Sequence, residues 1–386
     1  MRDSSGPTVA TAPRAIRTVA RSVRRSTFRT SVDVGLNGEE HRMGYELRTN
    51  VIDPERNTFS YLVERFGDRP ATRYQEATFN IQPVENFHYR PTWDANRELY
   101  DPDYSALKLS DPYTFVDPRH YYYTPYVAAA AARHEAFGQT LKYIEDRRLL
   151  DKLPDGWQIA LTGFVLPLRH YESGAQLVCL NASRLAWGTS IEQPIAFAAL
   201  DRIGNAQAHS LIGLAMAGGA GDTLTEAKKN WMYSRPLQGL RKMLEELLVE
   251  DDWAVGMIGL DLADELLFPV LFEHLDDRAL ARGATAYSLL ARHFGEWYRN
   301  HRKWMTPLLK AWVEDPAHGE SNRKAMNDIV GRWYPAAVAA MTEYAAGVAD
   351  AAGSTTVIGA VERAAAESAG QLRKLGIQVS DEEARA

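Results

Sequence analysis

The chain has 386 residues, 45% of them hydrophobic and 24% charged, so it can bury a large core as two domains or as one large domain with an arm. Its 44 basic and 50 acidic residues are interspersed and give a net charge of −6, which argues against a nucleic-acid partner. The single cysteine, Cys179, cannot form an internal disulfide and lies in an apolar run, so we expect a buried thiol in a reduced, cytoplasmic protein.

Residues 1–30 contain seven arginines and one aspartate, with serine, threonine and proline between them. This composition predicts a disordered basic tail. The stretch SVRRSTF (22–28) is similar to a twin-arginine export motif, but no apolar region follows it, so export is not expected.

Residues 31–118 are rich in aromatic residues, arginine and proline and have no sustained helical period. Their four Asp-Pro steps favour extended or turn backbone. We predict an extended arm that lies against its own helical body or against a partner subunit, because aromatic residues and arginine are enriched at interfaces. The candidate partner contacts are Trp93, Tyr100, Tyr104, Tyr113, Phe115, Tyr121, Tyr122 and Tyr123.

Residues 119–352 have helical periodicity almost throughout and no alternating strand pattern, which predicts an all-α, multi-helix bundle. The expected helices span 126–150, 155–186, 190–217, 223–250, 252–275, 277–315 and 321–352. Pro167 should kink or interrupt the second of them. The helix at 252–275 is apolar on nearly every side, which predicts a central position, and its acidic residues argue against a membrane span. Residues 353–386 are expected to form a loosely attached helix and an acidic tail.

No catalytic or metal-binding motif is complete in this chain. Di-iron helical bundles use a glutamate from each of two helices and a Glu-x-x-His pair from each of two others. The one Glu-x-x-His here joins Glu85 to His88, in a proline-bracketed segment too short for a central helix. The glycine motifs for dinucleotides and phosphates and the G-x-S-x-G elbow are absent. We therefore expect no catalytic residue, cofactor site or metal site in this chain.

Five stretches, in order, carry a resemblance to a known family: LSDPYTFVDPRHYYYTPY, KYIEDRRLLDKLPDGW, LRHYESGAQL, TSIEQPIAFAALDRIGNAQ and GDTLTEAKKNW. Together they resemble the β (small) hydroxylase subunit of bacterial multicomponent soluble diiron monooxygenases, most of all the propane and tetrahydrofuran branch. The resemblance covers roughly residues 45–345 and implies a ferritin-like helical bundle.

The resemblance also implies partners. In that family the α-subunit carries a non-haem diiron centre, and the β-subunit supports it in an α2β2 hydroxylase, with or without a third small subunit. A coupling protein and a reductase with NADH, FAD and a 2Fe-2S cluster complete the system. The implied reaction inserts one oxygen atom of O2 into a C–H bond of a short alkane, with propane as the expected substrate.

When the α-subunit's ligand pattern is laid over this sequence, only three of six positions carry a ligand-type side chain. The six positions are Glu135, Pro167, His170, Asn205, Glu265 and Phe268. Proline and phenylalanine cannot ligate a metal through their side chains, so neither Glu-x-x-His pair is complete. The resemblance therefore implies the remains of a metal site.

Other interpretations stay open at this stage. The chain could be a stand-alone protein that binds one metal ion through Glu135, His170 and Glu265, or a helical scaffold unrelated to oxygenases. It could also be the same subunit of a tetrahydrofuran, phenol or toluene monooxygenase. The aromatic residues of the arm could cover this chain's own bundle instead of a partner.

Overall fold

The computed structural model describes residues 59–83 and 98–379. The predicted basic tail, Glu85, His88, Trp93 and the acidic end from residue 380 lie outside the described residues. All described residues belong to one compact unit, Pro54–Ala386.

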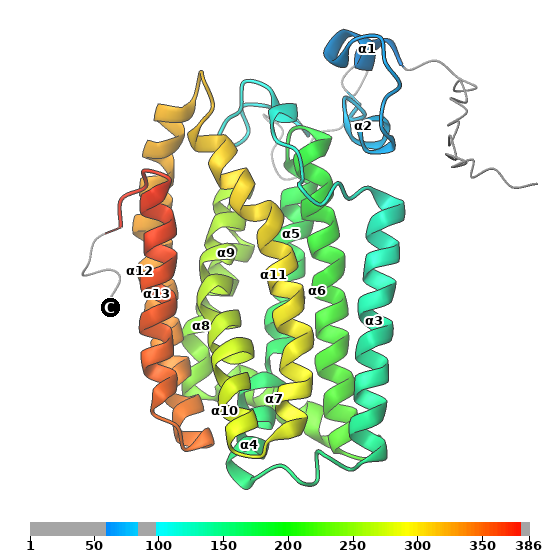
Figure 1. Ribbon diagram of the computed structural model, residues 1–386. Coiled ribbons are helices and arrows are strands. Elements are labelled where there is room, and N and C mark those ends of the chain that lie inside the picture. The colour runs from blue at the N-terminus through cyan, green and yellow to red at the C-terminus, as the bar shows by residue number, and fades with distance from the viewer. Residues whose placement is uncertain (1–58, 84–97, 380–386) are drawn as a thin grey trace, which may run out of the picture. The chain divides into compact units, whose positions relative to one another are not determined.

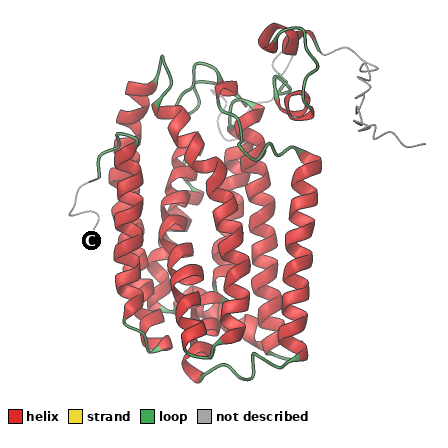
Figure 2. Cartoon of the chain, viewed as in Figure 1, coloured by secondary structure: helices red, strands yellow, loops and turns green. Residues whose placement is uncertain are grey.

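Long helices run side by side as a bundle (Figure 1). They are α3 (Tyr123–Asp146), α5 (Leu168–Leu185), α6 (Thr189–Met216), α9 (Trp253–Pro269), α11 (Thr285–Val313), α12 (Gly319–Ala352) and α13 (Thr356–Lys374). Shorter helices are α1 (Ser60–Phe66), α2 (Arg73–Thr78), α4 (Asp155–Ala160), α7 (Asp222–Tyr233), α8 (Arg235–Leu248) and α10 (Leu275–Ala281), with a 3-10 turn η1 (Pro112–Thr114) and π segments η2 (Leu161–Val165) and η3 (Val270–His274). The described ranges contain no strand, which confirms the predicted all-α class (Figure 2).

Helix boundaries differ from the expected ones at three places, each with a local cause. The helix predicted over 155–186 is interrupted by η2 and restarts after Pro167, as that proline predicts. The helix predicted over 223–250 is two helices, because Ser234 is extended and Pro236 opens α8. The helix predicted over 277–315 is divided: its first residues belong to α10, and α11 begins at Thr285, after Gly283 with a φ of 75°.

Helix α9 is the central helix of the bundle. Nearly all of its residues are buried, and it packs against α5, α8, α11, α12 and α13. This surrounding explains why its sequence is apolar on every side. Among the described residues, no helix is long and apolar enough to cross a membrane.

Helix α13 is firmly packed, which differs from the loose attachment that we expected. Its Val357, Val361 and Leu372 belong to the main core, and Ser368 donates a hydrogen bond to Glu265 of α9. The reason is an apolar stripe along one face of α13 that the alanine-rich composition obscured.

The described part of the arm is held on its own bundle. Asn322 Nδ2 donates to the Lys108 carbonyl (2.6 Å) and Asn322 Oδ1 accepts from the Lys108 amide (2.9 Å). The amide and hydroxyl of Ser110 both donate to Asp315 Oδ2, at 2.8 and 2.9 Å. Lys108 and Ser110 therefore lie against the loop between α11 and α12 and the start of α12, while the Ala106 amide donates to Asp252 and the Pro112 carbonyl accepts from Ser190 of α6.

The aromatic residues of the arm mostly face this chain. Tyr104 and Phe115 are buried in the main core, so their side chains offer no exposed surface to a partner, contrary to the expectation. Tyr113 and Tyr122 pack on the small cluster around Tyr74 and Phe79, and Tyr121 packs against Tyr126. Tyr100 is half-buried. Tyr123, at 73% exposure, is the described candidate that projects into solvent.

Candidate functional site: a buried charge cluster

Three charged side chains meet in the interior of the bundle. Glu172 comes from α5, Arg202 from α6 and Asp264 from α9, and all three are at most 1% exposed. Each sits on a helix whose other buried residues are mostly apolar. Burying such groups is costly unless they are paired, so their meeting is the most demanding feature of the fold.

The pairing is complete on the carboxylate side. Arg202 Nη1 donates to Glu172 Oε2 at 3.2 Å, and Nη2 donates to Asp264 Oδ2. The Tyr171 hydroxyl donates to Asp264 Oδ1 at 2.8 Å, and Asn205 Nδ2 donates to Glu172 Oε1 at 3.4 Å. Each of the two carboxyl groups thus accepts hydrogen bonds at both of its oxygens.

Aromatic rings enclose the guanidinium. Its carbon lies 4.6 Å from the Trp297 ring centroid, 5.8 Å from that of Phe268 and 6.0 Å from that of Tyr171. Rings at these distances stabilise a cation through their negative faces. His301, one turn after Trp297 on α11, is also buried, and its ring stacks on Trp297.

Burial controls the protonation of this cluster. It raises the pKa of Glu172 to about 7, although Arg202 acts in the opposite direction, and it also raises the pKa of Asp264. Burial alone would lower the pKa of Arg202, yet the carboxylates of Asp264 and Glu172 hold it well above its ordinary value. The guanidinium therefore stays charged, and Glu172 is the member that can take up a proton near neutral pH.

Three further ion pairs, in two groups, flank the cluster. Arg302 of α11 pairs with Asp261 and Glu265 of α9. Asp201 of α6 accepts from Arg133 Nη2 at 2.5 Å and from the Tyr126 hydroxyl at 2.9 Å, both on α3. It also accepts from the Trp297 indole at 3.2 Å, which joins α3, α6 and α11.

The six positions taken from the ligand pattern do not come together. Glu135 is exposed on α3, where Gln139 donates to it at 3.3 Å. Pro167 precedes α5, and the ring of His170 stacks on Trp231 of α7. Glu265 faces Arg302 and Ser368, as described above.

Of the six, Asn205 and Phe268 contact the central cluster, through Glu172 and Arg202 respectively. The structure therefore separates Glu135, His170 and Glu265, which removes the basis for one metal ion held by these three residues. Among the described residues, no group of three or more His, Cys, Asp or Glu side chains is arranged to hold a metal ion.

The residues that do face the interior match the layout of a di-iron bundle but not its chemistry. Two helices, α5 and α9, each supply one carboxylate. The other side chains at the cluster are Arg202 and Asn205 of α6, three residues apart, and Trp297 and His301 of α11. This corrects the register laid over the sequence, which placed the two pairs at Pro167/His170 and Glu265/Phe268: in the structure, Arg202 and Asn205 have the spacing of a Glu-x-x-His pair and face the interior. The Arg202 guanidinium lies between Glu172 and Asp264, where the metal ions of a di-iron bundle would bind. These residues therefore do not fit a diiron centre.

The sequence contained a signal for this cluster. Glu172, Arg202 and Asp264 are buried charges on helices whose buried residues are mostly apolar, although Asp201 adjoins Arg202 and Glu265 adjoins Asp264. The ligand search passed over Arg202 because arginine is not a metal ligand. Cys179 lies nearby and is fully buried as expected, and burial raises the pKa of its thiol to about 12.

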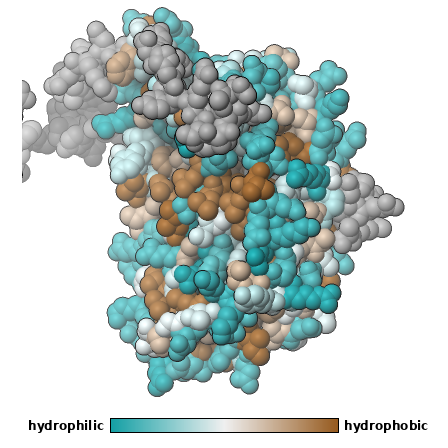
Figure 3. Space-filling model, turned by 180° about the vertical axis from the view of Figure 1, so that it is seen from behind, coloured by the Kyte–Doolittle hydropathy of each residue, from teal (hydrophilic) through white to brown (hydrophobic). Residues whose placement is uncertain are grey.

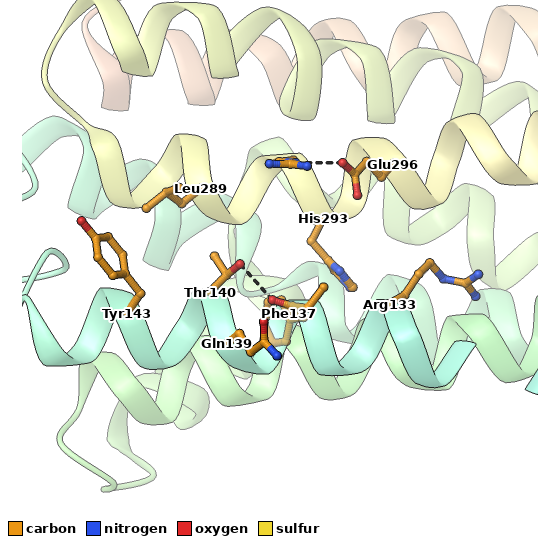
Figure 4. Close-up of a pocket in the computed structure, with 10 residues that line it drawn as sticks. Arg133, Phe137, Gln139, Thr140, Tyr143, Leu289, His293 and Glu296 are labelled. Atoms are coloured by element: carbon orange, nitrogen blue, oxygen red, sulfur yellow. Dashed lines mark hydrogen bonds and ion pairs between the residues drawn. The ribbon is translucent and has the colours of Figure 1, made fainter. Parts of the chain in front are cut away.

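A separate cleft of about 360 Å³ lies between α3 and α11 (Figure 4). His293 projects into it from α11 beside Arg133 of α3, and its ring lies 4.7 Å from that of Phe137. Burial, together with His134 and Arg133, lowers the pKa of His293 to about 4. The cleft thus holds a neutral imidazole at neutral pH and does not reach the charge cluster.

His293 should make the folded state sensitive to acid. Its pKa is about 4 in the folded chain and about 6.5 in the unfolded chain, so the unfolded state binds more protons between these values and stability falls as the pH falls through them. In His293→Gln, the loss of unfolding free energy from pH 6.5 to 4 should be smaller by about 2 kcal/mol. Urea denaturation at both pH values measures this, and equal losses in the two proteins would contradict it.

The family described as methane/phenol/alkene hydroxylase matches residues 91–316, more than half of the chain. The chain belongs to this family of hydroxylases, as the resemblance implied.

Particular relatives refine the assignment. The chain is 33% identical over 341 residues to the phenol 2-monooxygenase oxygenase component DmpL of Pseudomonas sp. (strain CF600), covering 88% of this chain and 100% of that one. It is 25% identical over 278 residues to the small subunit of the propane 2-monooxygenase hydroxylase component of Mycolicibacterium smegmatis, covering 69% and 74%. The crystal structure of xenon-pressurized phenol hydroxylase from Pseudomonas sp. OX1 matches with a TM-score of 0.79 at 33% identity, over 86% of this chain and 99% of that chain. The expected propane branch is not confirmed, because the phenol monooxygenase components are the more similar of these relatives.

Proposed function

We propose that this chain is the non-catalytic small (β) subunit of the hydroxylase component of a soluble diiron monooxygenase. The observation that carries the proposal is the interior of the bundle, where Arg202 and Asn205 stand in place of a Glu-x-x-His pair. A member of this hydroxylase family with such an interior can take part in oxygenation only through another chain that holds the irons. The mycobacterial relative named as a small subunit supports this assignment.

For the substrate of the complex we favour phenol or a related aromatic compound over propane. Two phenol 2-monooxygenase components align with this chain at 33% and 32% identity, and the propane relatives at 25% and 24%. In this proposal NADH supplies electrons through a reductase with FAD and a 2Fe-2S cluster, and a coupling protein regulates the hydroxylase. This chain contributes no residue to the bond-making steps.

An apolar surface supports the need for a partner. Five large apolar side chains on α5 and α6 are 38–52% exposed: Leu177, Leu180, Leu200, Ile203 and Leu211. On α6 they recur at helical spacing along one side. Figure 3 shows apolar residues gathered on one face of the bundle. Such a surface is costly in water and typical of subunit interfaces.

Purification of the tagged chain from its native host tests the proposal. We expect a larger subunit to co-purify in equal amount, the complex to oxidise phenol when supplied with its reductase and NADH, and the iron to stay with the larger subunit when the two are separated. Recovery of this chain alone as a stable monomer would contradict the proposal.

The double substitution Leu200→Glu/Ile203→Glu should reduce recovery of the larger subunit at least ~10-fold, because it places two charges in an apolar interface. Both side chains are exposed, so the melting temperature of this chain should change little. Ile358→Glu, at a similarly exposed apolar position on α13 (39%), is the matched control and should leave recovery unchanged. Equal recovery with all three proteins would exclude this surface as the interface.

A further inference from the structure

The centre of the bundle combines two carboxylates with a single cation. In di-iron bundles, carboxylates on facing helices converge on metal cations in the core. Here Glu172 and Asp264 converge in the same manner from α5 and α9, and the group between them is the guanidinium of Arg202.

We propose that the guanidinium of Arg202 takes the place of the metal cations in this bundle, so that a side chain neutralises the inward carboxylates and the fold is independent of metal. The inference goes beyond the proposed function, because it concerns what holds the interior together and not which partner the chain has.

The geometry gives Arg202 the contacts that a bound cation would need. Its two terminal nitrogens each bind a different carboxylate, so it joins α5, α6 and α9 at one point. Guanidinium matches carboxylates through directed donors and does not lose its proton in proteins. A metal ion, in contrast, would have to approach a permanent positive charge in a medium of low dielectric constant.

The neighbours of Arg202 close the site. Trp297 and Phe268 present rings to the guanidinium, and Asn205, one turn along α6, donates to Glu172. The rings and the amide surround the guanidinium and its carboxylates, although the buried Nε–H of Arg202 has no hydrogen-bond partner among the described residues, and they supply no anionic ligand to a metal. The raised pKa of Glu172 agrees with a neutral cluster. When Glu172 is protonated, the negative charge of Asp264 balances the positive charge of Arg202.

The test compares Arg202→Ala with Arg202→Ala/Glu172→Gln/Asp264→Asn in the full-length chain, taken in its complex if it is insoluble alone. Both variants leave the same cavity, but only the first leaves two buried acidic groups, Glu172 and Asp264, without a cation. We expect the single variant to melt about 5 °C or more below the triple variant, although it carries fewer substitutions.

Cobalt is the probe for metal binding. Added Co²⁺ should raise the melting temperature of Arg202→Ala and give a visible absorption band of protein-bound cobalt beyond that of the wild type. It should do neither in the triple variant, and EDTA should leave the melting temperature of the wild-type bundle unchanged.

Three results would overturn the inference. The first is a single variant as stable as the triple variant, which would make the charge of Arg202 irrelevant. The second is cobalt bound by the wild type and lost in Glu172→Gln/Asp264→Asn. The third is failure of both Arg202→Ala and the triple variant to fold. If only Arg202→Ala fails to fold, the folding of the triple variant supports the inference. None of these results depends on which larger subunit the chain binds, so they separate this inference from the proposed function.

Discussion

Arg302→Met is expected to lower the free energy of unfolding by about 3–5 kcal/mol, because it leaves Asp261 and Glu265 buried without their cation. Both carboxyl groups are less than 9% exposed, and Ser368 of α13 is the hydrogen-bond donor that stays with Glu265. The loss should therefore also weaken the attachment of α13. Urea denaturation at pH 7 measures the total effect.

Two comparisons sharpen this prediction. Arg302→Lys keeps the charge and should lose markedly less stability than Arg302→Met. Burial raises the pKa of Glu265 while Arg302 lowers it, so without the arginine that pKa rises further. The deficit of Arg302→Met should then shrink as the pH is lowered from 7 toward 5, where the carboxyl groups take up protons. A deficit that is independent of pH would show that the packing of the side chain, and not its charge, matters at this site.

Asp201→Ala is expected to cost about 3 kcal/mol and to loosen α3 selectively. The substitution removes the acceptor for the Tyr126 hydroxyl, the Trp297 indole and the Arg133 guanidinium. The Trp297 indole is buried and would be left unpaired, at about 1–3 kcal/mol, whereas the Tyr126 hydroxyl would keep only its contact with the Phe197 carbonyl at 3.2 Å. Because two of the three contacts come from α3, its amides should exchange hydrogen faster while those of α9 change little.

Asp201→Asn is the matched control for α3. It keeps one acceptor oxygen in nearly the same place, so it should retain most of the protection of α3 against exchange. The same exchange in α3 for the alanine variant and the wild type would mean that the apolar contacts of α3, and not Asp201, hold it on the bundle.

The helical class could be predicted from the sequence because the long helices have strong periodicity and α9 is apolar all round. The segments η2 and η3 could not be predicted as π segments, because LTGFV and VLFEH contain no residue pattern that separates a π turn from an α turn. Helix α13 was underestimated for a related reason: its small side chains give a weak apolar signal but pack closely.

The charge cluster shows where sequence reasoning stops. The rotation of a helix about its axis depends on what it packs against, so Glu172 faces the interior while His170, two residues earlier, faces α7. A search for metal ligands also cannot find a site whose ligands have been replaced, and Arg202 was missed for that reason. A charge within an apolar helical run is the more general signal, and it marks Glu172, Arg202 and Asp264 together with the buried Asp201, Asp261 and Glu265.

The arm illustrates the same limit for surfaces. Aromatic composition predicted contacts but not their direction, and Tyr104 and Phe115 proved to be buried in this chain's own core. The exposure of the leucine and isoleucine residues of α5 and α6 was not predicted, because large apolar residues in a mostly apolar helix are expected to be buried.

The position of iron in crystals of the intact complex tests the account most directly. Anomalous diffraction at the iron absorption edge should give peaks inside the larger subunit and none between Glu172 and Asp264 of this chain. An iron peak at that place, beside or instead of the Arg202 guanidinium, would contradict both the subunit's proposed role and the assignment of its central cation.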